Sequence, residues 1–255
     1  MHVRFLAVGA HPDDIESNAA GTLARMKRAG HEVACLICTD GAKGSEKVED
    51  GPRLKQIRQE EQRAASRVIG VDEVFFLDYV DGELRADLPL RRDISRIIRI
   101  FKPDVVLSWD PSSYWFGAYG LNHPDHMATG QETAYAVYPS ARDNLMFPEL
   151  YNEGLEGFKT RELWMFGTNQ PNLFIDIGQT FDKKMEALSR HVSQVNVADL
   201  AERMRARLRR RYRAFSNPIT QALQDHPEYV ESFRRIALDP IEDLMTKIAP
   251  AWFDD

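Results

Sequence analysis

The chain has 255 residues, 43% of them hydrophobic and 28% charged, which is typical of a globular protein with a full core. Its formal net charge is -6, so it lacks the basic surplus with which nucleic-acid binding proteins neutralise phosphates. No apolar run approaches the roughly 20 residues that span a bilayer. We therefore expect neither a membrane span nor a nucleic-acid partner, and we expect residues 3–10 to form a strand rather than a signal peptide.

Strand and helix patterns alternate along the first part of the chain. Buried-type strands are predicted over residues 3–10, 32–38, 74–77 and 104–109. Helices are predicted between them, over residues 18–30, 53–69 and 89–101. The first helix is expected to begin with Asn18 as its N-cap and to stop at Gly30. Residues 40–52 are rich in glycine and charged side chains and are predicted to form a loop.

The second part of the chain begins with an aromatic loop over residues 110–125. The elements predicted after it are a helix over 126–138, an irregular stretch over 139–160, strands over 161–166 and 173–177, helices over 179–193 and 196–214, and an irregularly helical tail after Pro218. This alternation predicts a Rossmann-like α/β fold, a doubly wound and mainly parallel sheet flanked by helices. We expect residues 1–195 to form the main domain and residues 196–255 a helical extension packed on it.

Two cysteines, Cys35 and Cys38, lie in the second predicted strand. Residues three apart on a strand point to opposite faces, so this pair is poorly placed to form a disulfide or to share a metal. We interpret both as buried apolar side chains. A chain without a disulfide framework is expected in a reducing compartment, here the cytoplasm.

The sequence Ala10-His11-Pro12-Asp13-Asp14 directly follows the first predicted strand. Ligands of α/β proteins gather at the carboxyl ends of strands, and a phosphate site there would contain glycines. This chain instead has an imidazole and two carboxylates, which are ligands for a divalent cation. Pro12 stiffens the turn, and His11 and Asp14 are candidate metal ligands.

A second cluster, Asn122-His123-Pro124-Asp125-His126, lies at the junction of the aromatic loop and the next helix. His126 completes a set of two histidines and one carboxylate that leaves a metal position open for catalysis. Zinc is the expected ion, although iron(II), cobalt or nickel also suit these ligands. Zinc held in this way lowers the pKa of its water to about 7.

Three further residues of the two clusters are candidate catalytic residues. Asp13 lies beside a ligand without needing to bind the metal, so it is a candidate general base. His123 is a candidate for stabilising an oxyanion or protonating a leaving amine. Asp125 is expected to hold His123 in the right tautomer and to raise its pKa.

Both clusters resemble motifs of the LmbE-like, or PIG-L, family of metal-dependent N-deacetylases. Four shorter elements add to the resemblance: Gly21-Thr22-Leu23, Thr39-Asp40-Gly41, Arg58-x-x-Glu61 and Asp81-Gly82-Glu83-Leu84. The likeness covers roughly residues 3–195. It implies a hydrolase that removes the acetyl group from an N-acetylglucosamine-type sugar derivative, a small-molecule substrate.

The resemblance also implies roles for individual residues. Zinc would be bound by His11, Asp14 and His126, with Asp13 as general base and His123 as the electrostatic or general-acid partner.

The sugar would be contacted by Arg58 and Asp81. Some family members place a tyrosine two residues before the first histidine of H-P-D-H, where it polarises the scissile carbonyl. This chain has Leu121 there, and Tyr119 is the nearest tyrosine that can take the role.

Other functions remain open beside this one. An amidase or deacylase of the same family would act on a larger thiol conjugate or a longer acyl chain, because loops set the pocket size. A non-haem iron oxygenase matches the H-x-D…H spacing but is expected on an all-β barrel. A nucleotide-binding module would need glycines in the first turn.

Two further segments have open interpretations. The aromatic residues Tyr114, Trp115 and Phe116 either stack on a sugar or pack locally. The arginine-rich stretch 203–213 is interpreted as a solvated helix face, with a contact between copies of the chain left open.

Overall fold

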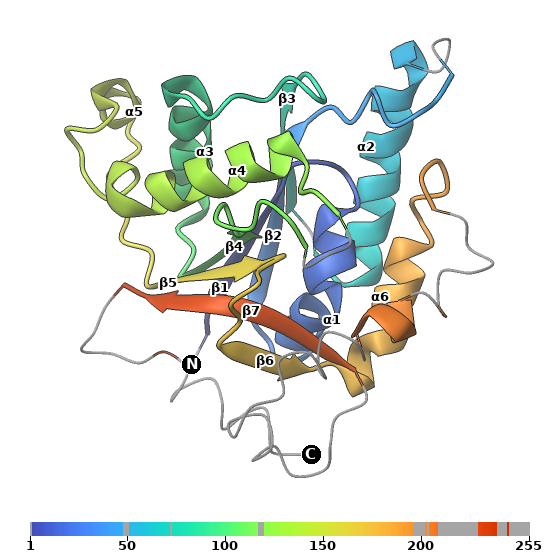
Figure 1. The fold of residues 1–255 in the computed structure, drawn as a ribbon. Helices are drawn as coiled ribbons and strands as arrows, with labels where there is room; N and C mark the ends of the chain where they lie inside the picture. The colour runs from blue at the N-terminus through green and yellow to red at the C-terminus, as the bar shows by residue number, and fades with distance from the viewer. Residues whose placement is uncertain are drawn as a thin grey trace.

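The computed structural model describes residues 2–47, 51–71, 73–116, 120–195, 202, 204–208, 229–238 and 244. A seven-stranded sheet with strand order β3-β2-β1-β4-β5-β7-β6 lies at the centre (Figure 1). Its strands are β1 Arg4–Gly9, β2 Glu32–Thr39, β3 Glu73–Tyr79, β4 Val105–Trp109, β5 Glu162–Phe166, β6 Leu173–Asp176 and β7 Val230–Ala237. β1 to β5 pair in parallel, and β7 runs antiparallel to both β5 and β6. The prediction of a mainly parallel α/β sheet is confirmed.

Helices cover both faces of this sheet. They are α1 Asp14–Arg28, α2 Gly51–Val68, α3 Leu88–Phe101, α4 Pro124–Tyr135, α5 Pro148–Asn152 and α6 Phe181–Leu188, with short η2 Ala136–Ser140 and η3 Gly178–Thr180. α1, α2 and α6 lie on one side of the sheet, and α3 and α4 lie on the other (Figure 1). None of the helices in the described ranges is long and apolar enough to cross a membrane.

β1 is apolar on both faces because each face meets a layer of helices. Phe5 and Ala7 pack in the core beneath α1, α2 and α6, whereas Leu6 and Val8 pack in the core beneath α3 and α4. The alternation follows from the two-residue period of a strand. Cys35 and Cys38 are free and buried in different cores, so their predicted placement on opposite faces is confirmed.

The strand order places the candidate site. From β1 the chain continues through α1 to β2 on one side, while β4 pairs with β1 on the other side. The carboxyl ends of β1 and β4 therefore meet where the strand order reverses, which is the switch point at which α/β sheets bind ligands. The turn at His11 follows β1, and the segment leading to His126 follows β4.

Several predicted helix ends are wrong. α1 begins at Asp14, with Asp13 at the N-cap position, and Asn18 is buried inside the helix, where its Nδ2 donates to the Asp14 carbonyl at 2.8 Å. Pro12 and the acidic first turn were the better start signals. α4 begins at Pro124 rather than 126, and the stretch expected to be irregular over 139–160 contains α5. The helix expected over 179–193 ends at Leu188.

The prediction of a helical tail is also wrong, because Val230–Ala237 form β7 between β5 and β6. This strand was missed because its charged residues, among them Glu231, Arg234 and Arg235, hide its strand pattern. The helix predicted over 196–214 lies mainly outside the described residues, although 204–208 are helical. A domain boundary near residue 195 stays a prediction.

Candidate metal centre and active site

Asp14 is the best-anchored residue at the end of β1. Its Oδ2 accepts hydrogen bonds from the backbone N–H of Ala10 at 2.8 Å and of His11 at 2.9 Å, and from the indole N–H of Trp109 at 3.0 Å. Burial alone would raise the pKa of this carboxyl, but His126 and His11 lower it well below the usual range. Asp14 is therefore a fixed, ionised carboxylate.

His126 reaches the same point from α4. The helix packs closely on the end of β4, since a Cβ at Gly130 would lie 2.4 Å from the Trp109 carbonyl oxygen. The His126 ring stacks on the Trp109 indole, with centroids 3.8 Å apart and planes 8° from parallel. Its Nδ1 lies 2.9 Å from Asn122 Oδ1, an acceptor, so Nδ1 carries the proton and Nε2 offers a lone pair.

Three side chains converge within the span of one metal ion. His11 Nδ1 lies 3.2 Å from His126 Nε2, Asp14 Oδ1 lies 3.2 Å from His126 Nε2, and Asp14 Oδ2 lies 3.7 Å from His11 Nδ1. Two nitrogen ligands of a tetrahedral zinc ion, each at about 2.0 Å, lie about 3.3 Å apart. The donor atoms of His11, Asp14 and His126 thus fit one divalent cation.

The other nitrogen of His11 is held by carboxylates. Its Nε2 lies 3.2 Å from Asp125 Oδ2 and 3.2 Å from Asp81 Oδ1. Burial lowers the pKa of His11, but Asp125, Asp14 and Asp81 outweigh burial and raise it to about 12. Such a cluster stabilises positive charge at this position, and oxygen partners on the outer nitrogen are the usual support for a metal-ligating histidine.

Two other groupings also bring ligand atoms within 4.8 Å of one another: His11 with His123 and His126, and His11 with Asp81 and Asp125. In the second of these groupings, both carboxylates already accept backbone hydrogen bonds. Asp125 accepts from the backbone N–H of Gly82 at 2.7 Å and of Leu84 at 3.2 Å, while Asp81 accepts from that of Lys43 at 2.9 Å. In the set of His11, Asp14 and His126, the candidate ligand atoms face one another, and the remaining ring nitrogen of each histidine contacts an oxygen atom.

The Asp125 carboxylate does not hold His123 in its tautomer, as the sequence led us to expect. The carboxylate faces His11, whereas His123 Nδ1 accepts from the Asp125 backbone N–H at 3.2 Å. Asp125 does raise the pKa of His123, as expected, but burial and the nearby His11 outweigh this effect, so the pKa lies below its ordinary value. A neutral His123 with Nδ1 as acceptor carries its proton on Nε2. Its ring centroid lies 4.7 Å from that of His11, one of the converging residues.

Asp13 has an unusual backbone conformation, with φ of 104° at the N-cap of α1. Its Oδ2 lies 3.4 Å from Arg58 Nη2, and Arg58 also donates to the carbonyls of Gly41 at 2.9 Å and Pro12 at 2.5 Å. Burial raises the pKa of Asp13 to about 6, with Asp14 adding to the rise and Arg58 opposing it. Asp13 is thus a carboxylate with raised basicity next to Asp14.

Of the candidate substrate residues, two are buried in the described structure. Arg58 is 3% exposed and occupied with the turn after β1, and Asp81 is 5% exposed and faces His11. Tyr119 lies outside the described residues. Leu121 is exposed and forms an isolated antiparallel β-bridge with Trp115, so the two described sides of the aromatic loop pair with each other.

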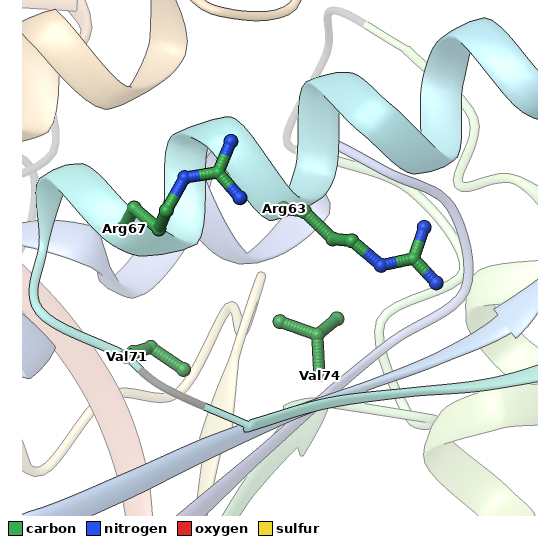
Figure 2. Close-up of a pocket in the computed structure, with 4 residues that line it drawn as sticks. All are labelled: Arg63, Arg67, Val71 and Val74. Carbon is green, nitrogen blue, oxygen red and sulfur yellow. The ribbon is translucent and has the colours of Figure 1, made fainter.

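A separate pocket lies away from these residues. Figure 2 shows its lining, with two arginines of α2 on one side and two valines near the start of β3 on the other: Arg63, Arg67, Val71 and Val74. The pocket adjoins the amino end of β3, whereas the candidate site lies at the carboxyl ends of β1 and β4. No residue of the candidate site lines it.

Some site residues were missed from the sequence. Trp109, Asn122 and Gln62 support His126, Asp14 or Asp13. Trp109 ends a predicted strand beside the first one, and Asn122 directly precedes H-P-D-H, so both positions carried a signal. Gln62 carried none, because its contact with Asp13 spans 49 residues of sequence.

Fold and site together define an α/β protein with a histidine and carboxylate centre at the switch point of its sheet. Residues 6–137 match the family model described as PIG-L, GlcNAc-PI de-N-acetylase. The chain belongs to this PIG-L, or LmbE-like, family. It is 31% identical over 192 residues to a diacetylchitobiose deacetylase of Thermococcus kodakarensis, covering 75% of this chain and 70% of the relative.

Solved structures give the same picture of the fold. An N,N'-diacetylchitobiose deacetylase from Pyrococcus horikoshii, in complex with an inhibitor, is similar with a TM-score of 0.79 and 27% identity over 94% of this chain and 88% of that one. A 4-carboxy-2-hydroxymuconate hydratase from Pseudomonas putida is similar with a TM-score of 0.75 and 22% identity, over 94% of this chain and 99% of that one. The second likeness concerns the fold alone, so the reaction must be argued from the site.

Proposed function

We propose that this chain is a metal-dependent N-deacetylase that hydrolyses the acetamido group of an N-acetylglucosamine derivative. The observation that carries the proposal is the convergence of His11 Nδ1, His126 Nε2 and the Asp14 carboxylate within 3.2 to 3.7 Å. Asp13, next to Asp14 in the chain, and His123, whose ring centroid lies 4.7 Å from that of His11, are the proposed groups that act beside the metal. Relatives named as deacetylases of diacetylchitobiose and of an acetamido-glucopyranoside support the substrate class.

Zinc is the proposed metal, and His11, Asp14 and His126 are its proposed ligands. Two imidazole nitrogens and one carboxylate suit zinc, and iron(II) is the main competitor for such a set. When bound, zinc polarises the amide carbonyl and lowers the pKa of a water molecule to about 7. The Asn122 amide and the Asp81 and Asp125 carboxylates keep the outer nitrogens of the two histidines protonated, so their inner nitrogens are free to bind.

Asp13 is the proposed general base. Its carboxylate takes a proton from the attacking water as the oxygen forms its bond to the acetyl carbon. As the carbon–nitrogen bond breaks, that proton is delivered to the amine, so acetate and a free amino sugar result. A positioned base of this kind typically contributes about 10²- to 10⁴-fold to the rate.

His123 is the proposed oxyanion stabiliser. The Asp125 N–H occupies its Nδ1, so its Nε2–H is available to donate to the oxygen that gains negative charge. Because the pKa of His123 is lowered, its imidazole is a neutral donor. A neutral donor suits a group that acts by hydrogen bonding rather than by proton transfer. Asp125 contributes by orienting both His123 and His11.

We also propose substrate contacts, a cellular compartment and partners for the enzyme. Arg58, Asp81 and Tyr119 are proposed to face the sugar, with Arg58 acting mainly through Asp13. The two buried free thiols favour a reducing compartment such as the cytoplasm. The acidic net charge disfavours a nucleic-acid partner, and assembly of several copies is compatible with the sequence.

Acetate release tests the proposal. The zinc-loaded protein is incubated with a panel of N-acetylglucosamine derivatives, beside Asp13→Asn and the exposed control His2→Ala. We expect release by the parent and the control, and a rate about 10²- to 10⁴-fold lower for Asp13→Asn. No release from any derivative, with one metal bound per chain, would contradict deacetylation and favour a larger amide or a longer acyl group.

A further inference from the structure

Gln62 of α2 connects the candidate base to a buried carboxylate. Its Oε1 accepts from the Asp13 backbone N–H at 3.1 Å, and its Nε2 donates to Glu16 Oε1 at 2.7 Å and to Ser66 Oγ at 3.2 Å. Gln62 is completely buried. Because a backbone N–H only donates and a carboxylate only accepts, these partners fix the orientation of the amide.

Gln62 and Arg58 hold the two ends of one peptide bond. Arg58 donates to the Pro12 carbonyl at 2.5 Å, and Gln62 accepts from the N–H of Asp13, the other half of the same peptide. The two side chains come from adjacent turns of α2, four residues apart, and so lie on one face of that helix. The orientation of this peptide sets the φ of Asp13, which at 104° lies where side-chain-bearing residues are rarely found. Such a conformation persists only when neighbouring groups enforce it.

Glu16 also lies close to a buried histidine on its other side. Its Oε2 lies 3.3 Å from His191 Nε2, and both side chains are fully buried. The buried Glu16 carboxylate is thus the acceptor for the Gln62 amide, at 2.7 Å. Because its Nε2 is held, the Gln62 amide presents its Oε1 to Asp13 without rotamer freedom. A precisely placed catalytic group needs supporting side chains that are locked in this way.

We propose that Gln62 is a positioning residue that holds the Asp13 carboxylate in its catalytic orientation through the backbone of Asp13. This inference rests on the proposed function, in which Asp13 is the general base. The metal ligands do not depend on Gln62. Asp14 is anchored by Ala10, His11 and Trp109, and His126 by Asn122. Loss of the Gln62 amide should therefore reduce turnover and leave metal binding intact.

The test uses Gln62→Met, which keeps the length of the side chain and removes both hydrogen-bonding groups. Gln59→Met is the matched control, because Gln59 lies on the same helix and, among the described residues, its side chain bonds the surface carboxylate of Asp78, at 2.7 Å. We expect Gln62→Met to lower kcat about 10- to 100-fold, since misplacement by about 1 Å costs that much, with KM and zinc content within about twofold of the parent. If Gln62→Met does not fold, Gln62→Asn, which is too short for both contacts, replaces it.

A double-mutant cycle separates positioning from general stability. In an Asp13→Asn background, Gln62→Met should change kcat by less than about threefold, because the group it positions is already gone. An equal loss in both backgrounds would overturn the inference.

A crystal structure of the variant gives a readout independent of activity. We expect Asp13 to leave its positive φ in Gln62→Met and to keep it in Gln59→Met. An unchanged Asp13 conformation in Gln62→Met would overturn the inference. If the parent released no acetate, the proposed function would fail, and the conformation of Asp13 would still decide whether Gln62 positions it.

Discussion

Two buried polar clusters lie along α1, and they differ in how their charges are matched. Near the middle of the helix, Lys184 Nζ meets three acceptors: Glu231 Oε1 at 2.6 Å and the carbonyls of Glu16 and Ser17 at 2.8 and 3.1 Å. Glu231 in turn accepts from the backbone N–H groups of Gly21 and Thr22. Every donor of the ammonium group has a partner, and one cation faces one anion.

The cluster at the start of α1 is not matched in this way. The carboxylates of Asp14, Asp81 and Asp125 surround His11, and the facing nitrogens of His11 and His126 lie 3.2 Å apart. The raised pKa of His11 expresses the surplus of negative charge. A cluster that completes its own hydrogen bonds holds the fold together, whereas one that leaves negative charge and lone pairs directed at a point is built for a cation.

Removal of a ligand should have the largest effect on the unmatched cluster. We expect His126→Ala to lose zinc at one equivalent and to reduce acetate release by at least about 10³-fold, since the metal contributes several kcal/mol of transition-state stabilisation. Metal analysis after dialysis and the rate of acetate release measure this. His2→Ala, at an exposed position, is the control. Full zinc retention by His126→Ala would place the metal elsewhere.

Breaking the matched cluster should affect stability and leave metal binding unchanged. Lys184→Met leaves the buried Glu231 carboxylate without its cation, which typically costs about 3–5 kcal/mol of unfolding free energy. Denaturant unfolding and zinc content measure the two effects. The double variant Lys184→Met/Glu231→Gln should recover part of the loss. Loss of zinc from well-folded Lys184→Met would show that the two clusters are coupled.

Removing a residue that orients a proposed metal ligand should weaken zinc binding less than removing the ligand itself. Asn122→Ala removes the acceptor 2.9 Å from His126 Nδ1, and we expect zinc affinity to weaken about 10- to 100-fold. Competition with a chelator of known affinity measures this, with Asn169→Ala as a control. An unchanged affinity would mean that stacking on Trp109 alone orients His126.

The smallest expected effect is a pH dependence at His191, whose Nε2 lies 3.3 Å from Glu16 Oε2. Burial lowers the pKa of His191, but Glu16 raises it above its ordinary value, with Asp13 and Glu61 adding to the rise. The pair therefore stabilises the fold fully below pH 6.5, and this stability is lost as pH rises through the folded-state pKa. Unfolding free energies of the parent and His191→Gln should converge as pH rises, and a constant gap would contradict the pairing.

Local sequence was enough to single out His11, Asp14 and His126, which the structure brings within 3.2 to 3.7 Å of one another. The supports depend on contacts that sequence spacing does not reveal. Gln62 is 49 residues from Asp13, and the Asp125 carboxylate turns toward His11, 114 residues away. β7 was missed for the same reason, since the partners of buried Glu231 are Lys184, 47 residues earlier, and the backbone N–H groups of Gly21 and Thr22, about 210 residues earlier.

The metal position in a zinc-loaded crystal tests the central claim most directly. Anomalous diffraction should place one ion about 2.0–2.2 Å from His11 Nδ1, His126 Nε2 and an oxygen of Asp14. An ion bound by His123 in place of Asp14, or held between Asp81 and Asp125, would contradict the account.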